Sequence, residues 1–221
     1  MNTTPIRPSY IATRNTEPII IDGLLSEQQW KRDGITNFTQ RDPVEGAQPT
    51  QRTELWISYD DNALYVAVRL YDSAPDSIVA RVGRRDSDLN SDWFFLAIDS
   101  YLDRRNGFFF GVNPSGSIKD GIIYNDEALD DSWDAVWDAE ARIDEQGWTV
   151  EMRIPYSQLR FEKKDEYIWG FNCLRIIERY KEEDYLVYIP KNESGFVSRF
   201  ADLIEIRDIQ MFQMVQPYSE P

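Results

Sequence analysis

The 221-residue chain is 42% hydrophobic, enough to bury the core of one domain, and 24 Lys and Arg against 39 Asp and Glu give it a net charge of -15. This charge repels phosphate backbones and argues against nucleic-acid binding. The absence of histidine removes Ser-His-Asp and Cys-His catalysis, the commonest zinc and non-haem iron sites, and histidine-ligated haem.

The N-terminal residues 1–18 are predicted to form a polar arm. They lack a basic region followed by an apolar stretch, so no secretory signal is visible, and the chain is expected to be either cytoplasmic or a piece of a longer one. No apolar run approaches 18 residues, so no membrane insertion by this segment is expected. The single cysteine, Cys173, lies in an apolar strand pattern and is predicted to be a small core residue.

Along the chain, Ile19 to Gly34 reads as a short strand, a turn and a short helix, with Ser26 and Gln29 spaced as a capping box. Apolar and polar residues then alternate over 54–59 and 64–71, which predicts a β-hairpin. Further strands are predicted over 93–99, 107–113, 117–124, 166–179, 184–190 and 198–206. One more helical turn is expected after Pro155.

The segment from Trp133 to Ile143 alternates apolar residues with charged ones, which predicts a strand with one buried and one solvent-exposed face. A turn then leads to a partner strand over 148–154, so the two form a second hairpin. Trp137 and Trp148 are predicted to pack in the core. For Trp133, beside two aspartates at the start of the strand, a core position and a rim position both stay open.

Many short strands separated by turn signals, with one or two short helices, predict an all-β fold of the β-sandwich type. We expect the sandwich to span residues 19–207. Residues 208–221 are predicted to be a tail or the start of a linker.

Seven phrases in order carry a resemblance that covers about Ile19 to Ile206: IDGLLSEQQW, YDDNALYVAVRLYD, SDWFFLAIDS, FGVNPSG, GWTVEMRIPYSQL, WGFN and SRFADLIEI. Together they resemble the family 9 carbohydrate-binding modules, in particular a branch found at the N-terminus of large bacterial envelope proteins. The resemblance implies a β-sandwich of immunoglobulin-like or jelly-roll appearance, which binds an oligosaccharide or polysaccharide and carries structural calcium.

The same resemblance implies an extracellular, periplasmic or cell-envelope location and a part in glycan catabolism, because such modules are often attached to glycoside hydrolases. No motif selects a pair of carboxylates for glycoside hydrolysis, so the module itself is predicted to be non-catalytic. An alternative of another class is a structural or interaction domain that packs on a downstream outer-membrane barrel without binding sugar. A haem-binding relative is disfavoured, since without histidine the axial ligand would be methionine or lysine.

Members of the resembled family bind the sugar between two tryptophan rings, with polar side chains around the sugar. Here the first tryptophan position is Leu89, the acidic position is Phe95 and the arginine position is Gly111. Asn113 matches the family asparagine, and the second tryptophan falls near Phe196. The fold is therefore implied more strongly than the binding mode.

A sugar site needs aromatic faces and planar polar groups in a preformed cleft. Asn113, Phe196, Trp133 and Tyr124 are the carbohydrate-binding candidates. In the alternative interpretation, Phe196 anchors its loop and Asn113 shapes the NPSG turn.

Calcium takes six to eight oxygen ligands, so acidic loops are where a site is sought. The family resemblance favours Asp72 and Asp92, and the loop between them adds Asp86 and Asp88. Solvated acidic loops are the competing interpretation of the same residues.

Overall fold

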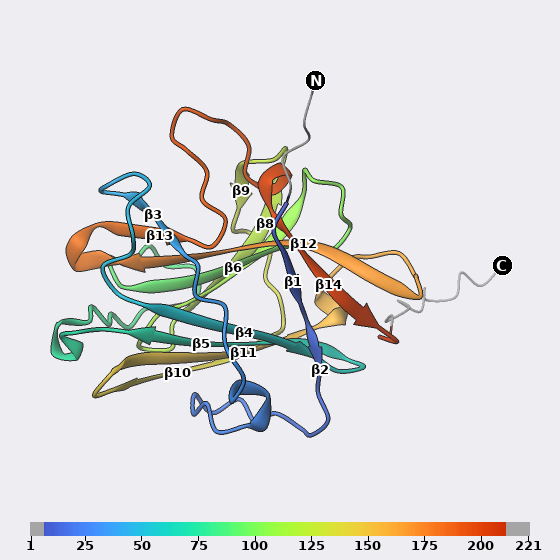
Figure 1. Ribbon diagram of the computed structural model, residues 1–221, viewed down its shortest axis with the longest axis horizontal. Helices are drawn as coiled ribbons and strands as arrows, with labels where there is room; N and C mark the ends of the chain where they lie inside the picture. Colours follow the sequence, from blue (N-terminus) through green and yellow to red (C-terminus); the bar gives the residue numbers. More distant parts are fainter. Residues whose placement is uncertain (1–6, 211–221) are drawn as a thin grey trace.

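The computed structural model describes residues 7–210 and consists of two β-sheets packed face to face (Figure 1). The larger sheet has nine strands. Seven follow in spatial order: β1 (Ser9–Ile11), β14 (Ala201–Arg207), β12 (Glu166–Ile177), β6 (Trp93–Asp99), β7 (Gly107–Val112), β8 (Ile118–Tyr124) and β9 (Ala128–Asp130). In addition, β13 (Glu182–Tyr185) pairs with β12, and β3 (Thr39–Asp42) pairs with β13. The smaller sheet has five, in the order β10 (Asp138–Asp144), β11 (Gly147–Pro155), β5 (Ala63–Tyr71), β4 (Thr53–Tyr59) and β2 (Thr13–Arg14). The predicted all-β sandwich is confirmed.

The alternation read in the sequence sets the register of both predicted hairpins. In the first, Leu55 of β4 lies opposite Val68 of β5, and both are fully buried. In the second, β10 pairs along its whole length with residues 147–153 of β11, with Trp148 in the core between the sheets. Because successive side chains point to opposite faces, one face of each hairpin faces the core and the other faces away from it.

The second hairpin begins later than predicted. Trp137 is buried as expected, but β10 starts at Asp138, and residues 131–137 belong to no strand. This segment leaves β9 in the larger sheet and crosses to β10 in the smaller one, so it has no ladder partner. Its alternation arises because Ala135 and Trp137 are directed into the core while their neighbours are exposed.

The capping box and the short strand predicted near the N-terminus are wrong, and the predicted short helix is only one 3-10 turn long. This turn is η1 (Gln28–Trp30), which has no side-chain cap, and Ile19 to Ile21 pair with no strand. Ile19 and Ile21 instead pack with Trp30 and Trp56 on the outer face of the smaller sheet. Tertiary packing therefore fixes this segment where local signals predicted regular structure.

Four more 3-10 turns complete the helical content of the described chain: η2 (Pro75–Ser77), η3 (Tyr156–Gln158), η4 (Glu178–Tyr180) and η5 (Val197–Arg199). The turn predicted after Pro155 is η3. Within residues 7–210 there is no helix with the length and apolar character needed to cross a bilayer.

The two short N-terminal strands join the layers. β1 runs parallel to β14 in the larger sheet, and β2, two residues later, runs parallel to β4 in the smaller one (Figure 1). Part of the predicted arm is thus built into the sandwich. Residues 1–6 of that arm and 211–221 of the predicted tail lie outside the described residues.

Candidate functional site

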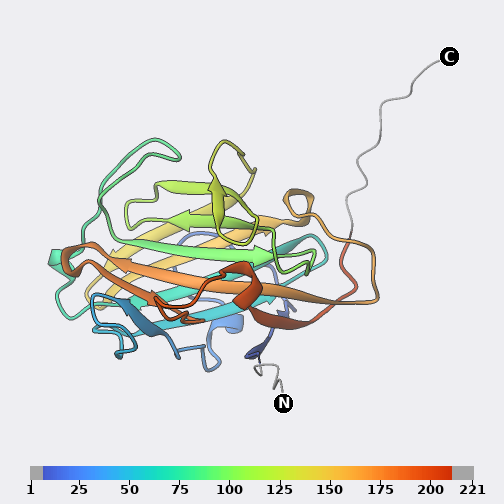
Figure 2. The same ribbon diagram turned by 90° about the horizontal axis from the view of Figure 1, so that it is seen from above.

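A hollow of about 350 Å³, which we call the sheet-face pocket, lies on the outer face of the larger sheet. Its floor comes from strands β6, β7, β8 and β12, and these strands lie side by side (Figure 2). The lining combines three phenylalanines, five other apolar residues and four polar side chains: Phe95, Phe109 and Phe196; Ala97, Ile123, Leu129, Cys173 and Leu174; Asp88, Lys119, Asp131 and Asn172. The apolar residues dominate, and Leu129 is 62% exposed.

Phe95 explains why the arginine position of the family is a glycine here. Its ring stacks on Trp93 with centroids 5.4 Å apart and lies directly over Gly111. A Cβ at Gly111 would come within 2.2 Å of the Phe95 ring, so no other residue fits without a rearrangement. The acidic and basic side chains that the resemblance implies are thus replaced by one ring packed on a bare backbone.

Phe196 reaches the sheet-face pocket from the loop that precedes β14. Its ring packs edge-on against Phe200 at 4.9 Å. The carboxylate of Asp126 fixes the loop, because it accepts the backbone N–H groups of Phe196 at 3.1 Å and Ser198 at 2.7 Å. These hydrogen bonds outweigh the burial of the group and keep the pKa of Asp126 below its ordinary value. Phe196 both anchors its loop and lines the pocket.

The polar rim of the sheet-face pocket is only partly free to bind a ligand. Lys119 donates to Asp88 at 2.6 Å and lowers the pKa of that carboxyl group. The Lys119 side chain is only 18% exposed, but Asp88 is fully exposed, so a ligand can displace it from Lys119. Asn172 is committed, because its amide exchanges hydrogen bonds with the backbone of Val187. Asp131, which follows β9, is exposed and also lines the pocket.

Asn113, the residue that matches the family, is fully buried below the turn between β7 and β8. Its Nδ2 donates to the carbonyl of Arg81 at 2.7 Å, and its Oδ1 accepts the N–H groups of Ser115 and Ser117. With these atoms occupied it shapes the NPSG turn and lines neither of the two hollows described in this section. We therefore leave Asn113 out of the site.

Trp133 and Tyr124 meet in a second hollow, the strand-end cleft, of about 370 Å³. It lies where β7 begins and β8 ends, and its lining is Ser100, Tyr101, Asp103, Asn106, Gly107, Phe108, Ile122, Ile123, Tyr124, Trp133 and Arg160. The predicted site residues are therefore divided, with Phe196 in one hollow and Trp133 and Tyr124 in the other. Trp133 is partly buried at the edge of the core, between its two predicted positions.

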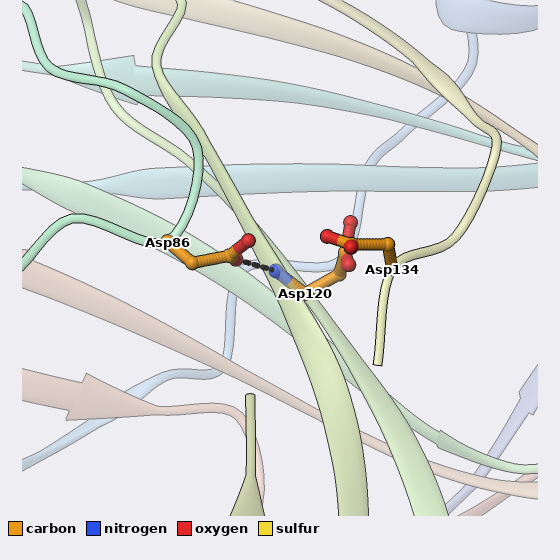
Figure 3. Close-up of side chains that lie close together, drawn as sticks. All are labelled: Asp86, Asp120 and Asp134. Carbon is orange, nitrogen blue, oxygen red and sulfur yellow. Dashed lines mark hydrogen bonds between the residues drawn. The ribbon is translucent and has the colours of Figure 1, made fainter. Parts of the chain in front are cut away.

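Outside the two hollows, three aspartate side chains form an acidic cluster: Asp86, Asp120 and Asp134 (Figure 3). One carboxylate oxygen from each lies within 4.8 Å of the other two. Asp120 is fully buried and accepts the indole N–H of Trp137 at 2.5 Å, and Arg85 forms ion pairs with all three aspartates. Because the guanidinium already supplies the positive charge, and Asp120 already accepts three hydrogen bonds, this cluster does not fit a calcium ion while Arg85 is in place.

The other predicted calcium ligands also have protein partners. Asp72 holds Arg179 through two hydrogen bonds of 2.7 Å each. Asp92 is buried and accepts the backbone N–H of Glu178, and burial raises the pKa of its carboxyl group to about 6. Asp88 pairs with Lys119 at the rim described above. Calcium binding stays a prediction for this chain.

Several residues that line the two hollows are not among the site residues predicted from the sequence. Phe109 and Lys119 could have been found from strand alternation, because they occupy outward positions of β7 and β8. Tyr101, Asp103 and Arg160 carry no such signal, because they come from loops whose meeting depends on the tertiary fold.

Comparison with solved structures shows that the fold is that of the family 9 carbohydrate-binding modules. One such module from Caldicellulosiruptor kristjanssonii, in complex with cellotriose, superposes with a TM-score of 0.65 at 16% identity, over 96% of this chain and 100% of that one. In its complex with glucose the TM-score is 0.63 at 16% identity, over 94% and 100% of the two chains. The resemblance read in the sequence is thereby confirmed at the level of the fold.

A protein from Bacteroides uniformis ATCC 8492 also matches, with a TM-score of 0.64 at 10% identity over 90% of this chain and 99% of that one. No family model and no curated protein matches the sequence.

Proposed function

We propose that the chain is a non-catalytic carbohydrate-binding module that holds a glycan in the sheet-face pocket. The observation that carries the proposal is the fold, which it shares over nearly its whole length with modules solved in complex with glucose and cellotriose. The pocket adds a chemical reason. The rings of Phe95, Phe109 and Phe196 offer apolar faces for the C–H surface of a sugar, while Lys119 and Asp131 can bind its hydroxyl groups.

The proposal extends to the setting of the protein. We propose that the module serves glycan catabolism by keeping an attached glycoside hydrolase near its substrate. We therefore propose an extracellular or cell-envelope location, with the rest of the parent polypeptide as the second partner. The net charge of -15 supports a neutral or cationic ligand over an anionic one.

Titration calorimetry with glucose, cellotriose and a wider set of neutral oligosaccharides tests this proposal. Phe196→Ala should raise the Kd at least about tenfold, which corresponds to about 1.4 kcal/mol. Tyr180→Ala is the matched control, because Tyr180 is an exposed aromatic residue that lines neither hollow. If no oligosaccharide binds, or if both variants bind like the unchanged protein, a sugar does not occupy the sheet-face pocket.

One observation favours a second candidate, an interaction domain that packs against another part of its polypeptide. The sheet-face pocket is lined mainly by apolar chains, and Leu129 stands exposed at its edge. In that case Leu129→Asp would weaken the attachment of the neighbouring domain and leave every sugar titration without heat.

A further inference from the structure

The strand-end cleft lies on the opposite face of the larger sheet from the sheet-face pocket. Phe108 and Ile122 are register partners on β7 and β8 and belong to the core side of the sheet. Their neighbours Phe109 and Ile123 belong to the apolar cluster on the outer side. The two hollows share Ile123 in their described linings, but their aromatic side chains lie on opposite faces of the sheet: Phe109 and Phe196 on the outer face, Phe108 and Trp133 on the core side.

Aromatic rings form the walls of the strand-end cleft: Trp133 is fixed by packing, and two tyrosines are partly exposed. Trp133 packs on Phe108 with centroids 5.0 Å apart and meets the edge of Phe110 at 6.4 Å, so its indole has a fixed orientation. Tyr101 and Tyr124 are 49% and 42% exposed. Three aromatic side chains that are not fully buried thus border one cavity, which is unusual for rings that serve only packing.

Of the polar side chains of the cleft, Asp103 and Asn106 are preorganised by hydrogen bonds, whereas Arg160 is exposed. Asp103 accepts the backbone N–H groups of Arg105 and Asn106 at 2.8 Å each, and the Asn106 amide at 2.7 Å. These bonds outweigh the burial of the carboxylate and lower its pKa, so it stays ionised and fixed. The guanidinium of Arg160 is exposed and has no carboxylate within ion-pair distance in residues 7–210.

We propose that the strand-end cleft is a second carbohydrate-binding site, which takes one or two rings of a neutral saccharide. Its volume of about 370 Å³ is at the lower end of the range for small-molecule sites, about 300–1,000 Å³. One anionic and one cationic side chain in the described lining, Asp103 and Arg160, leave no net charge. They can accept from and donate to hydroxyl groups, while Trp133 and the two tyrosines present aromatic faces.

Hydrolysis is not part of this proposal. Among the described residues that line the cleft, Asp103 is the sole carboxylate, whereas glycoside hydrolysis uses a pair of carboxyl groups across the scissile bond. The site therefore binds without cleaving. The inference rests on the proposed carbohydrate function for the class of ligand, and on the cleft itself for the place.

The test follows the indole N–H signal of Trp133 in a ¹⁵N NMR spectrum, assigned with Trp133→Phe. Glucose, cellotriose, xylotriose, mannotriose and maltotriose are titrated separately to millimolar concentrations. At least one should move the Trp133 signal in a saturable way. Tyr101→Ala and Tyr124→Ala should each raise the Kd of that titration at least about tenfold. Both side chains are about half exposed, so these variants keep the fold, which the same spectrum verifies.

Phe196→Ala separates this inference from the function proposed above. It should leave the titration of the Trp133 signal unchanged, because Phe196 lies on the other face of the sheet. The inference is overturned if no saccharide moves the signal, if neither tyrosine variant changes the Kd, or if Phe196→Ala abolishes the response. If calorimetry still detects a saccharide whose binding depends on Phe196 alone, the proposed function stands without the second site.

Discussion

Glu151 offers a quantitative test of how the N-terminal segment is fixed to the smaller sheet. Its side chain is fully buried on the outer face of β11. One carboxylate oxygen accepts the backbone N–H groups of Asp22 at 3.1 Å and Gly23 at 2.9 Å, and the other accepts the indole N–H of Trp30 at 3.0 Å. A single carboxylate thus holds three donors of a segment that belongs to no strand.

Burial raises the pKa of Glu151 from 4.5 to about 7, because loss of hydration outweighs the stabilising N–H groups. Between these two values the folded protein retains a proton that the unfolded chain has released. The free energy of unfolding therefore falls as the pH rises through this window, by about 3 kcal/mol in all for this group. Glu151→Gln cannot titrate, so the variant should lack this part of the pH dependence.

The measurement is urea unfolding, followed by tryptophan fluorescence at several pH values between 4.5 and 8. Asp92 and other buried acids titrate in both proteins, so the difference between the two curves isolates Glu151. Glu140→Gln is the control, because Glu140 is the cross-strand neighbour of Glu151 on β10 and is exposed. Parallel curves for the unchanged protein and Glu151→Gln over this range would refute the reasoning.

Two further predictions concern the sheet-face pocket and the acidic cluster. Gly111→Ala should lower the free energy of unfolding by about 1–3 kcal/mol, because the new methyl group overlaps the Phe95 ring. Urea unfolding measures this loss, and an unchanged midpoint would show that the ring moves aside at no cost. Arg85→Ala should cost on the order of 3 kcal/mol by leaving three carboxylates, Asp120 among them, without a counter-ion. Millimolar calcium should then restore part of the thermal stability of the variant. An equal calcium response in the unchanged protein would contradict the assignment of Arg85 as the resident cation.

The strands could be predicted because their determinants are local. Alternation places Leu55 and Val68 on the core side whatever the rest of the chain does, and a one-residue slip would expose the whole apolar set. Alternation alone does not identify a strand, because the segment around Trp133 has the same alternation but is a connection between the two sheets. The interaction of Trp30 with Glu151 spans 121 residues and has no local signal at all.

The candidate site could be predicted only in its residue types, because the faces on which Phe196 and Trp133 lie are decided by hydrogen bonds to two aspartates, the partly buried Asp126 and the buried Asp120, whose partners lie on other segments of the chain. Asp126 fixes the loop of Phe196 on the outer face of the larger sheet. Asp120 fixes the segment after β9 on the inner face, where it accepts the N–H of Ala135 and the indole of Trp137 and so positions Trp133. In the sequence both aspartates look like members of an acidic surface. Their hydrogen bonds divide the aromatic residues between two faces of one pair of strands, and this division lets β7 and β8 line a hollow on each side.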